Sequence, residues 1–108
     1  MNRAVTLSLA AAAAAVAITF AAPAHANLRL AQKNACTACH AVDKKLVGPA
    51  LADIAKKYAG QADAVAKLTE SIRKGGSGKW GPVPMPAQPA LAEADAKVLA
   101  EWVLAGAK

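Results

Sequence analysis

Five consecutive residues, Cys36-Thr37-Ala38-Cys39-His40, constrain the fold of this chain more than any other feature of its sequence. On a helical turn, residues three and four apart share a face, so both thiols and the imidazole project to the same side. This C-x-x-C-H spacing is the attachment signature of c-type haem. Each cysteine can form a thioether with one haem vinyl group, and His40 can place a ring nitrogen on the iron. We therefore predict one covalently bound haem c, attached through Cys36 and Cys39 and ligated by His40.

Other uses of two closely spaced cysteines fit the sequence less well. A disulfide between Cys36 and Cys39 would close a tiny loop and stabilise almost nothing. A thioredoxin-type redox pair expects a βαβ setting, and the chain has no sustained alternation of β-branched and polar residues. A structural zinc site usually has four ligands, and the two cysteines with His40 fall short of that number once the N-terminal segment is removed.

The N-terminal segment has the features of a secretory signal peptide. Arg3 gives it a positive charge, residues 5–20 are largely apolar, and Ala24-His25-Ala26 provides a small-x-small cleavage site. An uncleaved membrane anchor is the alternative, but the apolar run is shorter than the roughly 20 residues needed to span a bilayer. We predict that residues 1–26 are cleaved after export, leaving a periplasmic domain of residues 27–108 that does not span the membrane.

The sequence pattern of this domain predicts an all-α fold. Apolar residues at helical spacing favour four helices, and strand signals are almost lacking. The expected helices cover 27–38, with Asn27 as a candidate N-cap, then 51–58, 62–74 and 93–105. An irregular segment, 75–89, lies between the last two and contains four prolines and four glycines. Loops of this length are usually functional or disordered, and the presence of Trp80 and Met85 argues against simple disorder.

The second axial ligand of the iron is predicted by elimination. Without the N-terminal segment the chain retains one histidine, His40, and one methionine, Met85. Met85 lies in the segment 82–86, Pro-Val-Pro-Met-Pro, where each residue before a proline is pushed into extended geometry, so the segment is stiff. Filling a gap in the core is the usual role of methionine and is the alternative. Beside a haem motif, we predict that Met85 is the second axial ligand, which raises the reduction potential of the iron.

An iron with both axial positions filled has no place for a substrate. The predicted function is therefore outer-sphere transfer of single electrons, and the protein is not expected to be an enzyme. One alternative is a haem sensor or enzyme in which Met85 is labile and a gas or peroxide binds the iron. Another is a detached haem subunit of a larger reductase.

The chain carries a net charge of +6, which loss of Arg3 lowers by one. Its lysines are scattered and no platform of aromatic residues accompanies them, which argues against nucleic-acid binding. We expect a positive charge of this kind to steer the protein toward acidic patches on partner proteins.

The motifs together identify a family. The chain resembles the class I bacterial cytochromes c of the small c551 (c8) type, and the similarity spans nearly the whole predicted domain. The matching stretches are Cys36-Thr37-Ala38-Cys39-His40, Leu46-Val47-Gly48-Pro49-Ala50, Gly78-Lys79-Trp80-Gly81-Pro82-Val83-Pro84-Met85-Pro86 and Ala100-Glu101-Trp102-Val103-Leu104. The resemblance implies a class I cytochrome c fold, with about four helices around one covalently attached haem.

The resemblance also implies roles for residues near the haem. The Pro49 carbonyl would accept a hydrogen bond from the His40 imidazole, Trp80 would donate its indole N–H to a haem propionate, and Trp102 would pack the last helix against the first. Two positions depart from the family pattern. Gln88 stands where the family often has an Asn that bonds the axial sulfur, and Ser71 stands where it often has an Arg that faces a propionate.

Family members of this kind carry electrons between membrane-bound and periplasmic proteins. The resemblance implies a monomeric shuttle that takes electrons from a bc1-type complex and passes them to a nitrite reductase or a terminal oxidase. Docking would use the haem edge and a surrounding ring of lysines. The candidate lysines are Lys33, Lys44, Lys45 and Lys79.

Overall fold

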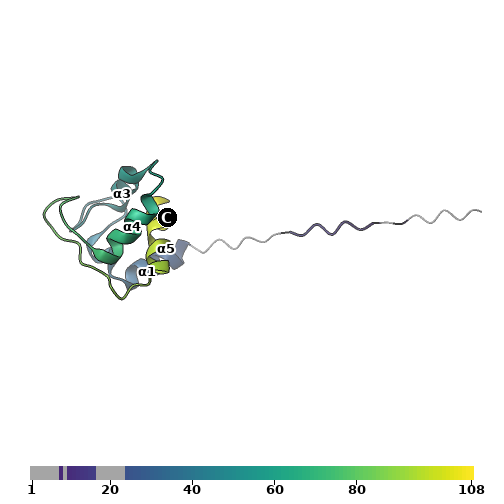
Figure 1. Cartoon of the computed structure of the whole chain (residues 1–108), viewed down its shortest axis with the longest axis horizontal. Coiled ribbons are helices and arrows are strands. Elements are labelled where there is room, and N and C mark those ends of the chain that lie inside the picture. The colour runs from purple at the N-terminus through teal and green to yellow at the C-terminus, as the bar shows by residue number, and fades with distance from the viewer. Residues whose placement is uncertain (1–7, 9, 17–23) are drawn as a thin grey trace, which may run out of the picture.

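The computed structural model describes residues 8, 10–16 and 24–108, and residues 24–108 form a small helical domain (Figure 1). Most of the predicted signal segment lies outside the described residues. The helices, in chain order, are α1 (Ala24–Lys33), α2 (Cys36–Cys39), α3 (Leu51–Tyr58), α4 (Ala64–Lys74) and α5 (Glu93–Leu104). The described residues contain no strand, only two isolated antiparallel bridges. None of their helices is long and apolar enough to cross a membrane.

The first predicted helix is wrong in its extent. A single helix over 27–38 was expected, but α1 ends at Lys33 and a separate turn, α2, carries the cysteines. Ala35 has a φ of 59°, a left-handed conformation that stops a right-handed helix. The Leu30 carbonyl near the end of α1 accepts from both the backbone N–H (3.2 Å) and the side-chain amide (2.9 Å) of Asn34. Because α1 begins at Ala24, Asn27 is not its N-cap in this structure.

The other three predicted helices are confirmed with small changes at their ends. Helix α3 has the predicted bounds. Helix α4 begins two residues later than expected, because the Ala64 N–H still bonds the Gln61 carbonyl in a turn (3.3 Å). Helix α5 ends at Leu104 instead of Ala105, just before Gly106, whose φ is 99°. Differences of one or two residues are normal at frayed helix ends.

Among the helices, α5 supplies the largest share of the buried core. Ala96 and Ala100 are fully buried, and their small side chains allow close packing. Leu99 is the largest side chain that is almost completely buried, at 2% exposed. Trp102 belongs to the same core cluster as Ala31 of α1, which agrees with the implied packing of the last helix against the first. Tyr58 of α3 and Leu68 of α4 lie in a second cluster with Ala100.

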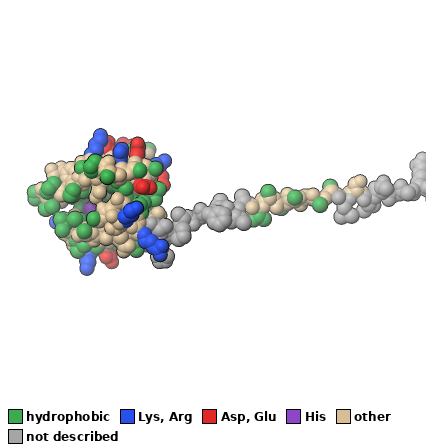
Figure 2. Space-filling model, turned by 90° about the horizontal axis from the view of Figure 1, so that it is seen from below, with side chains coloured by type: hydrophobic (Ala, Val, Ile, Leu, Met, Phe, Trp, Pro, Cys, Tyr) green, Lys and Arg blue, Asp and Glu red, His purple; other side chains and the backbone are tan. Residues whose placement is uncertain are grey.

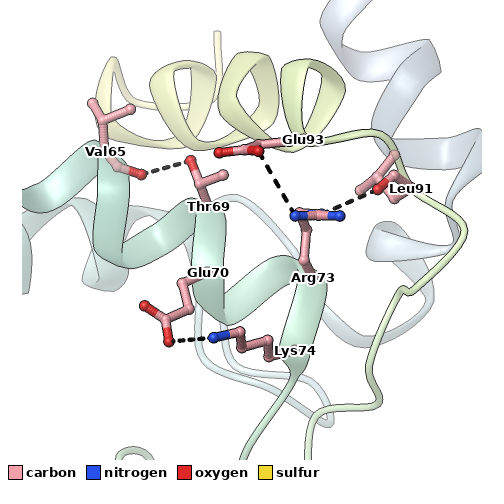
Figure 3. A network of polar contacts seen from close by, with 7 residues as sticks. All are labelled: Val65, Thr69, Glu70, Arg73, Lys74, Leu91 and Glu93. Carbon is pink, nitrogen blue, oxygen red and sulfur yellow. Dashed lines mark hydrogen bonds and ion pairs between the residues drawn. The ribbon is translucent and has the colours of Figure 1, made fainter.

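The segment between α4 and α5 is irregular but held at both ends. At its start, the Gly76 N–H donates to the Met85 carbonyl (3.0 Å) and the Met85 N–H donates to the Gly76 carbonyl (2.7 Å). At its end, the Arg73 side chain donates to the Leu91 carbonyl (3.3 Å) and lies 4.0 Å from Glu93, as Figure 3 shows. These contacts fix the loop against α4.

Candidate functional site

The cavity that contains the predicted site lies between α2, the core helices and the loop after α4. Its lining includes the four residues predicted to attach or ligate haem, which are Cys36, Cys39, His40 and Met85. Its walls are mostly apolar and include Leu51, Leu68 and Leu99. The structure thus brings together residues up to 49 positions apart in the sequence, from Cys36 to Met85, around one apolar space.

Both cysteines line this cavity as half-buried free thiols. They stand at the two ends of the single turn α2, so their side chains face the cavity together. Burial raises the pKa of the Cys36 thiol, a backbone hydrogen bond opposes this change, and the neighbouring Cys39 adds to it. The structure forms no disulfide between them, which leaves both sulfurs available for thioether bonds.

The orientation of His40 is fixed by the segment that follows it. Its Nδ1 lies 2.7 Å from the Pro49 carbonyl oxygen. A carbonyl can only accept a hydrogen bond, so Nδ1 carries the hydrogen and Nε2 is the nitrogen that remains free to bind a metal. Gly48 lies against the ring, where a Cβ would stand only 2.7 Å from His40 Cε1. The two residues together set the plane and tautomer of the imidazole.

Met85 is half-buried and reaches the cavity from the loop. Its backbone is paired with Gly76, and Gly75 lies directly beneath it. A Cβ at Gly75 would be 2.3 Å from the Met85 carbonyl oxygen, so only glycine allows this approach. The φ of Gly75 is 66°, which also favours glycine. Met85 is therefore positioned by its backbone neighbours as well as by the flanking prolines.

The two departures from the family pattern have defined partners. The Gln88 side-chain amide donates to the Asn34 carbonyl (3.1 Å), and the structure gives no hydrogen bond between Gln88 and Met85. Ser71 lines the cavity but cannot supply a charge. Arg73 is directed to Leu91 and Glu93 instead (Figure 3). Gln88 thus bonds the first helical region and not the Met85 sulfur, while Arg73 is held by Leu91 and Glu93.

Trp80 lines the cavity and is 41% exposed, so it stands at the edge of the site. Sequence reasoning missed its neighbour Lys57, whose ammonium lies 4.5 Å from the centre of the Trp80 ring. It also missed the close approach of Gly48 to His40 and the Gln88–Asn34 hydrogen bond. No local pattern signals such contacts, because each joins residues that are adjacent only after folding.

The residues of the cavity fit a covalently attached haem. The lining is apolar apart from a few groups, as a large flat porphyrin requires, and two thiols, one free imidazole nitrogen and one thioether reach it. Trp102, which also lines the cavity, has a buried indole N–H without a hydrogen-bond partner in the described chain. Such a donor is costly to bury unless a bound group accepts from it. The described residues contain no cluster of three or more His, Cys, Asp or Glu side chains that could hold a metal ion.

Known proteins match this chain along most of the helical domain. The family model described as cytochrome c matches residues 28–107. A cytochrome c-551 of Pseudomonas denitrificans is 55% identical over 75 residues, which cover 69% of this chain and 90% of that protein. A cytochrome c-552 of Hydrogenobacter thermophilus is 57% identical over 79 residues, which cover 73% and 80%. The crystal structure of wild-type Nitrosomonas europaea cytochrome c552 aligns with a TM-score of 0.71 and 52% identity, covering 73% of this chain and 98% of that one.

Proposed function

Because the chain belongs to the cytochrome c family, we propose that it is a periplasmic carrier of single electrons whose haem iron is held by His40 and Met85. The observation that carries this proposal is the meeting of both residues with Cys36 and Cys39 in one apolar cavity. Family membership already establishes the all-α class I fold and one covalently attached haem c. The axial ligands, the cellular compartment and the partners are the parts that we propose.

The residues around the cavity hold His40 and Met85 in fixed positions, which favours electron transfer. A bound haem supplies an iron that gains and loses one electron. His40 presents Nε2 to that site because Pro49 holds the hydrogen of Nδ1. Met85 presents a soft sulfur from a backbone that is hydrogen-bonded to Gly76, so little reorganisation is needed when the charge changes. If His40 and Met85 both hold the iron, no position would remain there for a substrate, and a bound haem would exchange electrons through the exposed edge of the cavity.

The surface around the cavity supports brief encounters with redox partners. Trp80, Val47 and Val83 line the cavity and are 41%, 54% and 57% exposed. Weak redox encounters use small interfaces, and an apolar edge of this kind suits them. We propose a bc1-type complex as donor and a nitrite reductase or terminal oxidase as acceptor. The proposed docking lysines are exposed: Lys33, Lys44, Lys45 and Lys79.

The absorption spectrum of the oxidised and reduced protein tests the axial ligands. The wild type is expected to be low-spin and to show a charge-transfer band from the methionine sulfur to ferric iron. Met85→Ala should abolish that band and open the iron to carbon monoxide and cyanide at neutral pH. Val83→Ala, an exposed residue of the same loop, is the matched control and should keep the band. A high-spin wild type, or a band that persists in Met85→Ala, contradicts the proposal and favours a sensor or enzyme.

The compartment is tested separately by the mass of the mature protein. We propose cleavage after Ala26 and release into the periplasm. Intact-mass measurement of the periplasmic fraction should give residues 27–108 plus one haem. Recovery of the holoprotein only from membranes, with the N-terminal segment attached, would show an anchored carrier instead.

A further inference from the structure

The tip of the loop after α4, residues 77–84, forms hydrogen bonds mainly within the loop and makes few with the rest of the domain. The Gly76–Met85 pair closes the loop at its base, and the Gly78 N–H donates to the Gly81 carbonyl within the tip (2.9 Å). The contacts of Gln88 with Arg73 and Asn34 lie beyond the base. Among the described residues, a single hydrogen bond joins the tip to another element, and it comes from Lys57.

Lys57 contacts the tip in two ways. Its ammonium donates to the Lys79 carbonyl at 3.5 Å and lies 4.5 Å from the centre of the Trp80 ring. A cation over an indole face is the most favourable cation–π pairing. Lys57 forms no ion pair with the described acidic residues, so no carboxylate competes for the ammonium. It stands in the last turn of α3, whose neighbouring residue Tyr58 is buried in the core, so the cation comes from a fixed position.

Trp80 and Lys79 both line the haem cavity, so the contact of Lys57 bears directly on the site. We propose that Lys57 is a positioning residue that holds Trp80, and with it the loop tip, against α3 at the mouth of the haem cavity. The inference rests on the proposed function, since it assumes that Trp80 faces the bound group there. Loss of the ammonium would free the indole ring without disturbing the backbone pair that holds Met85.

The test uses three variants of the haem-loaded protein. Lys57→Met removes the ammonium and keeps an unbranched apolar stem. Lys56→Met removes the same charge from the neighbouring exposed residue, for which the described residues give no hydrogen bond or cation–π pair with the tip. Lys57→Arg retains a cation that can stack on the indole. The chain has two tryptophans, so the indole N–H of buried Trp102 serves as an internal reference in ¹H–¹⁵N spectra of the reduced protein.

Lys57→Met should shift the Trp80 indole resonance and raise its exchange rate with solvent about two- to fivefold, the change expected for loss of a surface cation–π contact. The Trp102 resonance should stay unchanged. The reduction potential should fall further in Lys57→Met than in Lys56→Met, although both lose one positive charge, and Lys57→Arg should restore wild-type values.

Equal spectra and equal potentials for the Lys57→Met and Lys56→Met variants would overturn the inference. That result is distinguishable from failure of the proposed function, which shows as the missing methionine band in the wild type. If the band is present and the two variants behave alike, only the role of Lys57 is lost.

Discussion

At the scale of single residues, the orientation of His40 depends on two neighbours that act by different means. Pro49 holds the ring with a hydrogen bond of 2.7 Å, and Gly48 leaves room for it. The Gly48 backbone is not in the left-handed region, so its requirement for glycine comes from contact and not from conformation. A glycine here serves to bring the backbone close to the imidazole.

Gly48→Ala should therefore move the imidazole. The added methyl would lie closer than van der Waals contact to three ring atoms, at 2.7, 3.0 and 3.2 Å, and we expect a loss of about 1–3 kcal/mol of unfolding free energy, as for other overpacked sites. Gly60→Ala is the control, because Gly60 has a positive φ but nothing within 4 Å of a built Cβ. Both variants should lose stability to denaturant, but only Gly48→Ala should change the His40 ring resonances of the reduced protein. Unchanged ring resonances would show that Gly48 does not position His40.

The residues of the site differ in how far the sequence could predict them. Cys36, Cys39 and His40 share one turn, so spacing alone placed them together, and elimination singled out Met85. The His40–Pro49 hydrogen bond followed from resemblance and is present in the structure. Lys57 could not be predicted, because its contact with Trp80 joins a helix end to a loop 23 positions away in the sequence. Such pairs are set by tertiary packing and leave no local pattern.

At the scale of elements, the loop after α4 is built on glycines with two distinct purposes. Gly75 and Gly78 both have positive φ, at 66° and 94°. Only Gly75 is also crowded, with the Met85 carbonyl and the Ala87 nitrogen within 2.7 Å of a built Cβ. Alanine substitutions at Gly75 and Gly78 therefore separate two free-energy costs, that of a strained backbone conformation and that of displacing Met85.

Gly75→Ala should weaken the attachment of Met85, whereas Gly78→Ala should not. The first substitution must push the Met85 backbone away, so the methionine charge-transfer band should decrease and cyanide should bind the ferric iron faster. The second should cost only the about 1 kcal/mol of a strained backbone and keep the band. Equal spectra for the two variants would mean that the loop absorbs the clash without moving the sulfur.

Helix α5 illustrates how the core depends on one element. Leu99→Ala should lower the unfolding free energy by about 2–5 kcal/mol, because it opens a cavity at an almost completely buried site. Its neighbour Val98 is 38% exposed, and Val98→Ala is the control, expected to cost clearly less. Guanidinium unfolding of the holoproteins, followed by circular dichroism, measures both. Similar losses of unfolding free energy in the two variants would indicate that the bound haem, and not the packing of Leu99 in α5, stabilises this part of the core.

Helix positions were predictable where apolar periodicity was strong, and less so where one residue adopts an unusual conformation. Helices α3, α4 and α5 lay within two residues of expectation. The break between α1 and α2 arises from an alanine with positive φ, a conformation that alanine's sequence preference argues against. The conformation of the turn α2 is set by tertiary contacts, which the helix propensities of single residues do not predict.

At the scale of the whole molecule, net charge and the spread of the charged side chains bear on how the protein meets other molecules. On the face seen in Figure 2, lysine and arginine side chains are spread over the domain with hydrophobic side chains between them. The chain nevertheless carries a net charge of +6, and Lys79 lies beside the haem cavity. A long-range attraction for anions combined with an apolar contact edge suits fast and short-lived encounters.

Electron transfer to an anionic oxidant such as ferricyanide should therefore slow as salt is added, because the Debye length is only about 10 Å at 0.1 M. Lys79→Gln should lower the rate at low salt and flatten its salt dependence. Lys97→Gln removes a lysine that lines a separate surface groove between α4 and α5 and should have a smaller effect. Stopped-flow rates over a range of ionic strength provide the measurement. Identical slopes for the two variants would show that only net charge matters.

The backbone pair between Gly76 and Met85 has a consequence for how such a protein can change over evolution. It makes residues 77–84 a closed module whose length and sequence can vary while Met85, the proposed sulfur ligand, stays in register. Insertions at the tip would then alter the partner-facing rim and leave the iron's coordination intact. The surface that meets a partner and the backbone that holds Met85 can then change separately within one short stretch of chain.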